Sequence, residues 1–519
     1  MNIEHDELDI DGLSNNEYWK GTQSIYRDNK HCFDSLSENL VKKYGFERKL
    51  SRDSVLYEIM SVQYKNNKNL FDVNILVWSL IYLMVFLFIL VSGLFSLCFS
   101  FFSKKSHTEV IYEEMWPTKS LYNRFYEYID VKISSENIRR TVLLISPGIN
   151  FINEKIQSWK GPVINRRYSG LVFNFRISFR VFFCDLLYLF SLIKLSKINK
   201  VNYIYIYLRL LRKLLTYYSQ SHDIKARVLI SASDYYWNPI KYHMYKRNIN
   251  KIILLQHNHC DDYLHVRMFQ YCDYYYAHSQ QSINKHALCG SAKFFNVGSF
   301  QLIPYMVENK WNDNDNDNDN DNDNDIVFVS QTVFDNLVSN CKELDQGKLQ
   351  DSYKTLVDNF YNYLKKNPSV KAVYMSKTGY GDNQPTVDDR KTFEGINNIK
   401  FVETNGKETF KFISSSKVVI NMYSTVGFES YGLNKRVLWI NYNGCCDVFN
   451  FNTDDEDIHV MTSNTDYDAF EDRLNLLLSE SDILDVHYGK LKQKYMNVCK
   501  SPANIVASQI ESILKDDHV

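Results

Sequence analysis

The chain has 519 residues, which exceeds the size of a single hydrophobic core and predicts two or three domains. Its hydrophobic content of 45% is typical of globular proteins, and its formal net charge of −1 argues against a nucleic-acid-binding protein. The ten cysteines include no C-x-x-C pair, which argues against a disulfide framework or a zinc ribbon and indicates reduced, cytosolic thiols.

The N-terminal part of the chain predicts a polar extension followed by a membrane segment. Residues 1–72 are polar, with helical spacing from Leu36 to Tyr64. Residues 73–104 predict a transmembrane helix, because Ile75–Phe102 contains no charged residue and a span needs about 20 apolar residues. This length also leaves room for a hairpin that turns near Ser92 and Gly93. Residues 106–137 predict one or two connecting helices.

Residues 138–310 predict a first Rossmann-like domain. Its strands are expected at 141–146, 227–231, 251–256, 272–277 and 294–297. A helix at 240–248 separates two of these strands, and that alternation is typical of a parallel sheet with crossover connections.

A basic, apolar section lies inside this domain. From Arg166 to Lys213 the chain has ten Lys or Arg residues, and Asp185 is its single acidic residue. One interpretation is a set of amphipathic helices at an anionic lipid surface. The other is ordinary core helices with a solvated basic rim. The neighbouring apolar segment favours membrane contact.

Residues 311–325 predict a disordered linker, because 312–325 consists of seven consecutive Asn-Asp pairs without an apolar residue. A calcium loop is the alternative, although the Gly and the closing Glu of an EF-hand are missing. Residues 326–519 predict a second Rossmann-like domain. Its strands are expected at 326–330, 371–376, 399–403, 417–421, 436–441 and 457–461, with helices at 349–366 and 407–414 and two terminal helices.

The most informative stretch of this second domain is Ser414–Asn441, which reads as a strand–turn–helix–turn–strand unit. Ser424 and Thr425 begin its helix, and Gly432-Leu433-Asn434 ends it. The turn places two hydroxyls and the free N–H groups of a helix N-terminus at the carboxyl edge of a parallel sheet, where a phosphate is favoured. Glu429, about one turn further along, is placed to reach a ribose hydroxyl.

The order SSSKVVIN, STVGFES and KRVLWI resembles the donor-nucleotide half of GT-B glycosyltransferases that build bacterial surface and capsular polysaccharides. The motif order is also similar to that of polysialyltransferase-like and CDP-glycerol glycerophosphotransferase-like enzymes. LQHNH, YCDYYYA and NVGS resemble the other half of these enzymes, with Asn258 where the family usually has Gly. The resemblance covers about residues 225–300 and 326–480. It implies two Rossmann-like domains that face a cleft, with the active site between them.

The resemblance and the strand ends together suggest donor-binding residues. Where the family usually has Lys-x-His-Pro, this chain has Ser376-Lys377-Thr378-Gly379, which leaves Lys377 as the cation for the donor phosphate. Gln331, at the end of a predicted strand, is a further candidate. The donor-binding candidates are Gln331, Lys377, Ser424, Thr425, Gly427 and Glu429. The alternatives are a solvated lysine for Lys377 and a plain helix cap for the residues around Thr425.

Two residues at strand ends of the first domain are candidates for catalysis. An inverting sugar transfer needs a general base for the acceptor hydroxyl, and Asp234 and His257 are placed to supply it. The alternative for Asp234 is a helix N-cap before Asn238-Pro239. The alternative for His257 is a hydrogen-bonded histidine that holds the interdomain turn.

A metal site is a rival interpretation. His257-x-His259-x-Asp261-Asp262 approximates the H-x-H-x-D-H motif of metallo-hydrolases, with further ligands required downstream. His286 and His459 are the distant candidates, and neither has a supporting motif. We expect no metal and no cofactor apart from the nucleotide-sugar co-substrate.

The sequence therefore predicts a membrane-associated glycosyltransferase that moves a sugar from a nucleotide-activated donor to a surface polysaccharide or lipid-linked glycan. The alternatives are a polyol-phosphate transferase of the CDP-glycerol type and an inactive glycan-binding or scaffold protein of the same fold. We expect the inner membrane as its location, with the catalytic domains on the cytoplasmic side because donors are cytosolic. A single crossing would leave the N-terminal extension outside.

Overall fold

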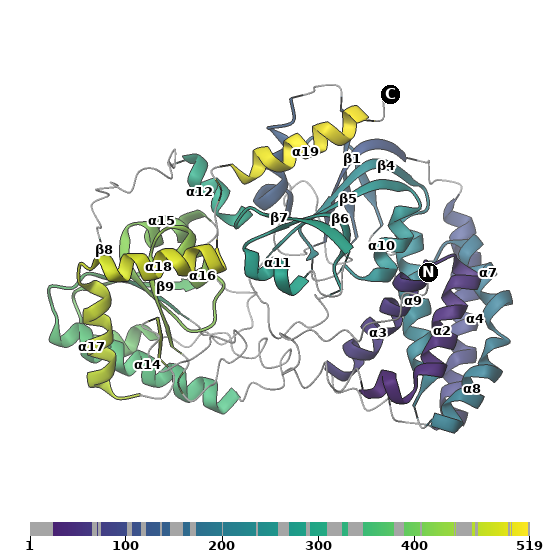
Figure 1. Cartoon of the computed structure of the whole chain (residues 1–519), viewed down its shortest axis with the longest axis horizontal. Helices are drawn as coiled ribbons and strands as arrows, with labels where there is room; N and C mark the ends of the chain where they lie inside the picture. The colour runs from purple at the N-terminus through teal and green to yellow at the C-terminus, as the bar shows by residue number, and fades with distance from the viewer. Residues whose placement is uncertain are drawn as a thin grey trace, which may run out of the picture.

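The structure is a computed structural model, and its described part forms two parallel β-sheets, each flanked by helices (Figure 1). This confirms the predicted fold class of two Rossmann-like α/β domains. The described residues are 24–64, 70, 74–100, 106–115, 121–134, 138–145, 159–166, 173–199, 201–234, 237–257, 269–286, 291–308, 324–330, 346–377, 389–404, 407–440, 442, 459–461, 465–496, 499 and 501–516.

The first sheet has the strand order β3-β2-β1-β4-β5-β6-β7, and every pairing in it is parallel. Toward their carboxyl ends, the central strands send alternate side chains into two different cores, as the two-residue period of a strand predicts. On β1, for example, Ile111 faces one core and Val110 faces the other. The strands are β1 Ser106–Glu114, β2 Arg140–Leu144, β3 Val163–Asn165, β4 Ile224–Ser231, β5 Ile249–Leu255, β6 Tyr271–Ala277 and β7 Ser291–Asn296.

A thick layer of helices covers one face of this sheet. It contains α2 (Lys30–Tyr44), α3 (Arg48–Tyr64), α4 (Ile75–Ser100), α7 (Phe175–Asp185), α8 (Tyr188–Asn199), α9 (Tyr203–Ser221) and α10 (Pro239–Lys246). The helices α2 and α3 fall within the predicted extension, yet they share this core with α9 and α10. Of the basic section, α9 is a core helix, because apolar residues from Tyr203 to Leu215 are buried along it.

The expectation of connecting helices at 106–137 is wrong for its first part. Residues Ser106–Glu114 form β1, which lies between β2 and β4 in the first sheet, whereas the predicted domain starts only at residue 138. Helical structure follows later, in the π-helix η2 (Tyr122–Tyr126) and in α5 (Glu127–Asp130). The acidic residues Glu113 and Glu114 made the strand look polar, but both are buried at its end with hydrogen-bond partners.

The second sheet has the strand order β10-β9-β8-β11-β12-β13 and is also parallel throughout. Its strands are β8 Asn324–Val329, β9 Ala372–Lys377, β10 Ile399–Thr404, β11 Ser416–Asn421, β12 Arg436–Ile440 and β13 Val460–Met461. Its helices are α14 Gln346–Lys366, η6 Asp389–Phe393, α15 Lys407–Ser414, α16 Val426–Gly432, α17 Tyr467–Leu478 and α18 Asp482–Tyr495. Along the chain, α11 Gln280–His286 lies between β6 and β7. The helices η5 Phe300–Leu302 and α12 Ile303–Glu308 lie between β7 and β8.

Two predicted boundaries of the second domain differ from the structure. The last helix, α19 (Pro502–Asp516), packs on the first sheet and not on the second (Figure 1). There Arg227 donates a hydrogen bond to the carbonyl of Ile513, and Val506 and Ile510 enter the core below. Of the predicted linker, Asn324 and Asp325 begin β8, while 311–323 lie outside the described residues.

Candidate functional site

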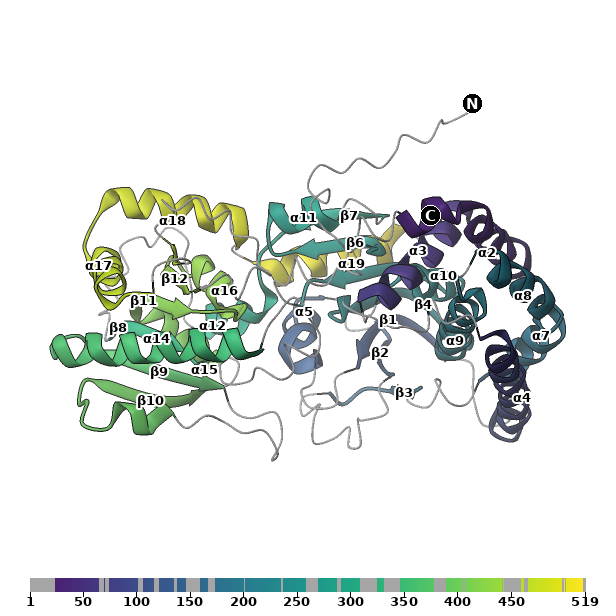
Figure 2. The same ribbon diagram turned by 90° about the horizontal axis from the view of Figure 1, so that it is seen from below.

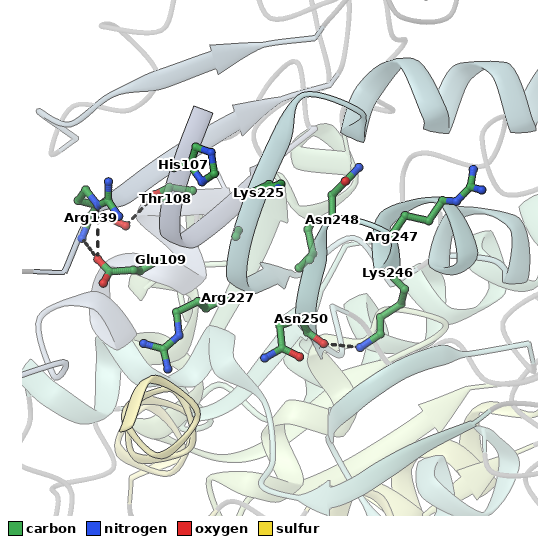
Figure 3. Close-up of a pocket in the computed structure, with 12 residues that line it drawn as sticks. His107, Thr108, Glu109, Arg139, Lys225, Arg227, Lys246, Arg247, Asn248 and Asn250 are labelled. Carbon is green, nitrogen blue, oxygen red and sulfur yellow. Dashed lines mark hydrogen bonds and ion pairs between the residues drawn. The ribbon is translucent and has the colours of Figure 1, made fainter. Parts of the chain in front are cut away.

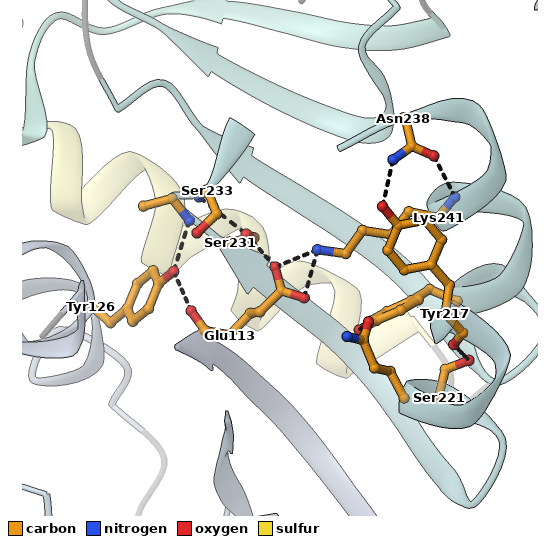
Figure 4. Close-up of polar contacts among 11 residues, drawn as sticks. Glu113, Tyr126, Tyr217, Ser221, Ser231, Ser233, Asn238 and Lys241 are labelled. Atoms are coloured by element: carbon orange, nitrogen blue, oxygen red, sulfur yellow. Dashed lines mark hydrogen bonds and ion pairs between the residues drawn. The ribbon is translucent and has the colours of Figure 1, made fainter. Parts of the chain in front are cut away.

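The carboxyl end of β4 is held by a buried polar network that begins at Glu113 (Figure 4). Glu113 accepts hydrogen bonds from the Ser231 hydroxyl at 2.7 Å and from the Lys241 ammonium at 2.9 Å. Ser231 in turn accepts from the backbone N–H of Ser233 at 3.2 Å, and Tyr126 accepts from the N–H of Ala232 at 2.7 Å. The backbone from Ser231 to Ser233 is therefore fixed from two sides.

The ion pair in this network is fully buried. Both Glu113 and Lys241 are inaccessible to solvent, and the ammonium also lies 4.4 Å from the centre of the Trp237 ring. Burial lowers the pKa of Lys241, and the neighbouring Glu113 carboxylate opposes that shift. An ion pair without water is favourable when further hydrogen bonds complete it, as Ser231 does here.

Asp234, the first predicted catalytic residue, follows directly after this fixed turn. Its side chain is fully buried, and its carboxylate accepts a hydrogen bond from the Tyr275 hydroxyl at 3.0 Å. It is not the cap of α10, because the side chain of Asn238 caps that helix at the N–H of Lys241. The neighbouring Ser233 hydroxyl is also buried, and it has no hydrogen-bond partner among the described residues.

His257, the second predicted catalytic residue, lies beside the same turn. Its Nδ1 is 3.1 Å from the carbonyl oxygen of Ala232, and its ring lies 5.1 Å from that of Phe125. A carbonyl only accepts, so Nδ1 carries the proton, and the neutral ring then has its lone pair on Nε2. The carbonyl of His257 accepts a hydrogen bond from the Gln301 side chain at 2.9 Å.

The predicted donor turn lies at the carboxyl end of β11. The side chain of Asn421 donates to the carbonyl of Ser424 at 2.8 Å, and the Ser424 hydroxyl accepts from the N–H of Val426 at 3.4 Å. Thr425 is the N-cap residue of α16, and within the described residues its hydroxyl makes no cap hydrogen bond. Ser424 and Thr425 are both partly exposed, so this turn presents two hydroxyls at the surface of the second half.

Gly427 has a packing role in this turn. A Cβ atom at this position would lie 2.5 Å from Nδ2 of Asn421 and 2.6 Å from the ring of Trp439. These distances are shorter than van der Waals contact, so the turn and the indole approach each other only because residue 427 lacks a side chain. The donor-binding role predicted for Gly427 stays a prediction.

A hydrogen bond joins the two halves at their candidate residues. The hydroxyl of Ser299, which follows β7, donates to the Glu429 carboxylate on α16 at 2.7 Å, and both side chains are buried. Ser299 also caps η5, which carries Gln301, and Gln301 holds the carbonyl of His257. One short turn therefore connects the His257 strand end to the helix that begins after Thr425.

The remaining predicted site residues are less fully described. Lys377 is the last residue of β9, at the carboxyl edge of the second sheet, and its donor-binding role stays a prediction. Gln331 lies outside the described residues, as do His259, Asp261 and Asp262 of the alternative metal motif. Within the described ranges, no three His, Cys, Asp or Glu side chains are grouped so as to hold a metal ion.

A separate cavity of about 490 Å³ lies at the opposite, amino-terminal edge of the first sheet (Figure 3). The first residues of β1, β4 and β5 line it, together with the basic side chains Arg139, Lys225, Arg227, Lys246 and Arg247. Arg139 is paired with Glu109, and Lys246 is paired with Asp273. Because the cavity lies at the amino-terminal edge of the sheet, it is remote from the carboxyl strand ends that carry His257 and Asp234.

Several residues of the site were missed from the sequence alone. Ser299 was not chosen as a site residue, although it lies in the NVGS motif that carries part of the resemblance and that could have indicated it. Glu113 was missed because β1 was taken for a helix, and Lys241 because a lysine in an amphipathic helix normally points to water. No sequence signal identified Gln301.

No protein-family model matches the sequence, and no curated protein matches it either. Solved structures with a similar fold include the UDP-GlcNAc 2-epimerase from Neisseria meningitidis bound to UDP-GlcNAc, at 9% identity and a TM-score of 0.43. It covers 79% of this chain and 100% of its own.

Two further solved structures are similar to this chain. One is MurG from Acinetobacter baumannii, at 11% identity and a TM-score of 0.42, covering 78% of this chain and 99% of its own. The other is the wall teichoic acid polymerase TagF, at 12% identity and a TM-score of 0.43, covering 79% and 90%. At these identities and TM-scores the similarity assigns no activity and no residue role to this chain.

Proposed function

We propose that this chain is a membrane-associated, metal-independent glycosyltransferase. It would transfer a sugar from a nucleotide-activated donor to a surface polysaccharide or a lipid-linked glycan. The observation that carries this proposal is the Ser299–Glu429 hydrogen bond, which joins the turn after β7 of the first sheet to the helix after β11 of the second. Ligands of open parallel sheets bind outside the carboxyl ends of the strands, so a site formed by both edges suits two substrates.

In this proposal His257 is the general base. The Ala232 carbonyl orients its ring, and Nε2 takes the proton of the acceptor hydroxyl as that oxygen attacks the anomeric carbon. The bond from the anomeric carbon to the donor phosphate breaks, and the nucleotide leaves with the bonding electrons. Because the acceptor oxygen then replaces the phosphate oxygen from the opposite side, the reaction inverts the anomeric centre.

The second half would bind the leaving nucleotide. Ser424 and Thr425 supply hydroxyls to the donor phosphate, and Lys377, at the end of β9, supplies a cation. Glu429 accepts a hydroxyl hydrogen bond from Ser299, and a ribose hydroxyl is a donor of the same kind. A carboxylate accepts several hydrogen bonds, so Glu429 would bind the ribose hydroxyl and keep Ser299.

Asp234 takes a supporting role in this scheme. Its carboxylate is fully buried and bonded to Tyr275, whereas His257, although also buried, keeps 5% of its surface exposed, and a general base must reach the acceptor. It lies two residues after Ala232, whose carbonyl orients His257. We therefore propose that Asp234 positions the turn from Ser231 to Ser233 and that His257 removes the proton.

The test is nucleotide binding by the full-length protein. We expect CMP, UDP, CDP or GDP to raise the melting temperature, with or without a chelator, because the site uses side chains in place of a metal. Glu429→Ala should remove this stabilisation. Glu403→Ala is the matched control, because Glu403 is an exposed carboxylate near the end of β10. It should leave the nucleotide response unchanged.

Other results would decide against this proposal. Stabilisation that disappears with chelator would indicate a metal-dependent site. A response to none of the nucleotides would indicate a binding or scaffold protein of the same fold. For the chemistry itself, His257→Gln should abolish release of nucleotide from a sugar donor while nucleotide binding persists. If the His257 variant turns over normally, His257 is not the base.

A further inference from the structure

The apolar helix α4 does not separate two compartments of the molecule. The helices before it and the helices after it share one core. Glu58 on α3 is fully buried and forms an ion pair with Arg209 on α9 at 2.8 Å. Asn39 on α2 donates a hydrogen bond to the Tyr207 hydroxyl on α9 at 3.1 Å. Residues on both sides of α4 therefore lie on the same side of any membrane.

One face of α4 packs closely on the helical layer along most of its length. Trp78 lies 5.2 Å from the Tyr205 ring on α9, and the Tyr82 hydroxyl donates to the carbonyl of Asp185 at 2.6 Å. Farther along, Ser92 accepts a hydrogen bond from the N–H of Phe173 at 2.9 Å. A Cβ on Gly93 would lie 2.6 Å from Cβ of Ser178, so α7 contacts α4 directly there.

The other face of α4 is exposed and apolar from Leu76 to Phe95. Of the described residues, α4 is the one helix long and apolar enough to span a membrane, and 28% of its most apolar segment is buried. Its exposed residues are Leu76, Val77, Leu80, Leu83, Met84, Leu87, Phe88, Val91, Leu94 and Phe95. Exposed apolar residues continue on α7 and α8 and in the turn between them, at Phe179, Phe183, Leu187, Phe190 and Ile198. Figures 1 and 2 place α4, α7 and α8 at the end farthest from the second sheet.

The charges on these helices are of one sign at the surface. The exposed residues of α7 and α8 include Arg176, Arg180, Lys194 and Lys197. The single acidic residue of the two helices, Asp185, is buried and paired with Lys43 and Tyr44. Apolar side chains beside exposed cations suit the boundary between acyl chains and anionic headgroups.

We propose that the exposed apolar face of α4, α7 and α8 inserts into one leaflet of an anionic lipid bilayer, with α4 lying along the membrane and not crossing it. A protein partner fits less well, because specific interfaces include polar contacts and the exposed face of α4 provides none from Leu76 to Phe95. This membrane contact does not depend on whether the chain transfers sugars.

Vesicle flotation with the full-length protein tests the surface. We expect binding to vesicles of equal parts phosphatidylcholine and phosphatidylglycerol, and weaker binding to phosphatidylcholine alone. The double variant Met84→Ser with Phe190→Ser changes residues that are 71% exposed on α4 and on α8. Vesicle binding should weaken by about tenfold or more, because two apolar side chains that would lie in the hydrocarbon of the bilayer are replaced by polar ones. The melting temperature should not change.

The matched control is Ile483→Ser with Val486→Ser on α18. These residues are 77% and 61% exposed, and they lie in the second half. The control should bind vesicles as the parent does. Equal binding by the α4–α8 variant and the parent would overturn the proposal. Nucleotide stabilisation of the same variants is measured separately, so failure of the lipid surface is distinguished from failure of the proposed transferase.

The topology has its own test. Tags at the two ends of the chain are exposed to protease in inverted membrane vesicles from expressing cells. Because α2, α3 and the sheet form one body, we expect both tags to be removed together. A tag before α4 that stays protected while the C-terminal tag is removed would show that α4 crosses, and the one-leaflet proposal would be wrong.

Discussion

The carboxyl edges of the two sheets are stabilised in different ways. At the first edge, buried charges and hydroxyls fix the backbone, through the contacts of Glu113 with Lys241 and Ser231. At the second edge, aromatic packing fixes the helix after the turn, with Phe428 lying 4.7 Å from the Trp439 ring and 5.4 Å from that of Tyr495. The polar side chains Ser424 and Thr425 remain partly exposed there.

This difference fits two different tasks. A base must be held in one orientation before the acceptor arrives, and a network of charged hydrogen bonds holds the turn beside His257 in that way. A phosphate-binding turn needs polar groups that remain available, so its position is better fixed by apolar contacts behind it. We therefore expect the stability of the first half to depend on buried charges and on pH, and the stability of the second half to depend on the volume of its side chains.

Removal of the buried cation should have the largest effect. Lys241→Met leaves the Glu113 carboxylate buried without its ion-pair partner. We expect a loss of about 3–5 kcal/mol in the free energy of unfolding, measured by urea denaturation. The double variant Glu113→Gln with Lys241→Met should recover part of that loss, because it removes the unpaired charge.

A surface pair in the second half is the control for this prediction. Lys366 contacts Glu471, but its side chain is 61% exposed, so water replaces the carboxylate when the pair is lost. Lys366→Met should unfold at the urea concentration of the parent. If Lys241→Met also unfolds there, the first edge does not depend on its ion pair.

Acid should destabilise the helical layer of the first half over a defined range. Burial lowers the pKa of His243 to about 4, and its Nε2 contacts the carbonyl of Tyr44 at 3.2 Å. As the pH falls from 6.5 to 4, the unfolded chain binds a proton that the folded chain does not, so stability decreases by up to about 3 kcal/mol. Above pH 6.5 the imidazole is neutral in both states and has no effect.

The variant His243→Gln isolates this contribution. Its free energy of unfolding should decrease less than that of the parent between pH 6.5 and 4. The second half carries His459, where burial and then His487 lower the pKa to about 3, so its contribution extends to lower pH. Identical pH dependence of the free energy of unfolding in the parent and in His243→Gln would show that His243 does not cause the loss of stability between pH 6.5 and 4.

A small increase in volume should affect the second edge. In Gly427→Ala the new methyl group meets Asn421 and Trp439, and we expect a loss of about 1–3 kcal/mol in stability from overpacking. Gly489→Ala is the control, because no atom lies within 4 Å of a Cβ at this position on α18. That variant should gain about 0.5–1 kcal/mol from helix propensity. Equal effects of the two substitutions would show that the turn is not tightly packed.

The sequence was sufficient to predict the central strands of the second sheet. The apolar runs around Val418 and Val437 are buried on both faces, so they read as parallel strands, and Asn434 ends the crossover helix with a φ of 58°. The first half was harder, because β1 ends in two glutamates and its local pattern favours a helix. Only tertiary contacts make these residues suitable for a strand, since Lys241 is far from Glu113 along the chain.

The candidate site was predictable in part for the same reason. Strand ends and turn signals made His257, Ser424 and Glu429 candidates, because each follows from local pattern, and their roles stay predictions. Local sequence does not specify which groups meet across the junction, so the Ser299–Glu429 contact required the structure. For the membrane segment, composition alone predicts a helix long and apolar enough to span, and the structure adds that its packing partners lie elsewhere in the sequence.

The smallest expected effect concerns the junction itself. Ser299→Ala removes the hydroxyl that joins the halves, and we expect a loss of about 1 kcal/mol in stability. Each half retains its own core, so neither should unfold. The radius of gyration from small-angle scattering should instead increase, because the halves separate more readily. Ser134→Ala is the matched control, since Ser134 donates to Glu511 at an exposed site on the first half, and it should leave the scattering unchanged. Unchanged scattering in Ser299→Ala would show that other contacts, such as those between α11 and α18, hold the edges together.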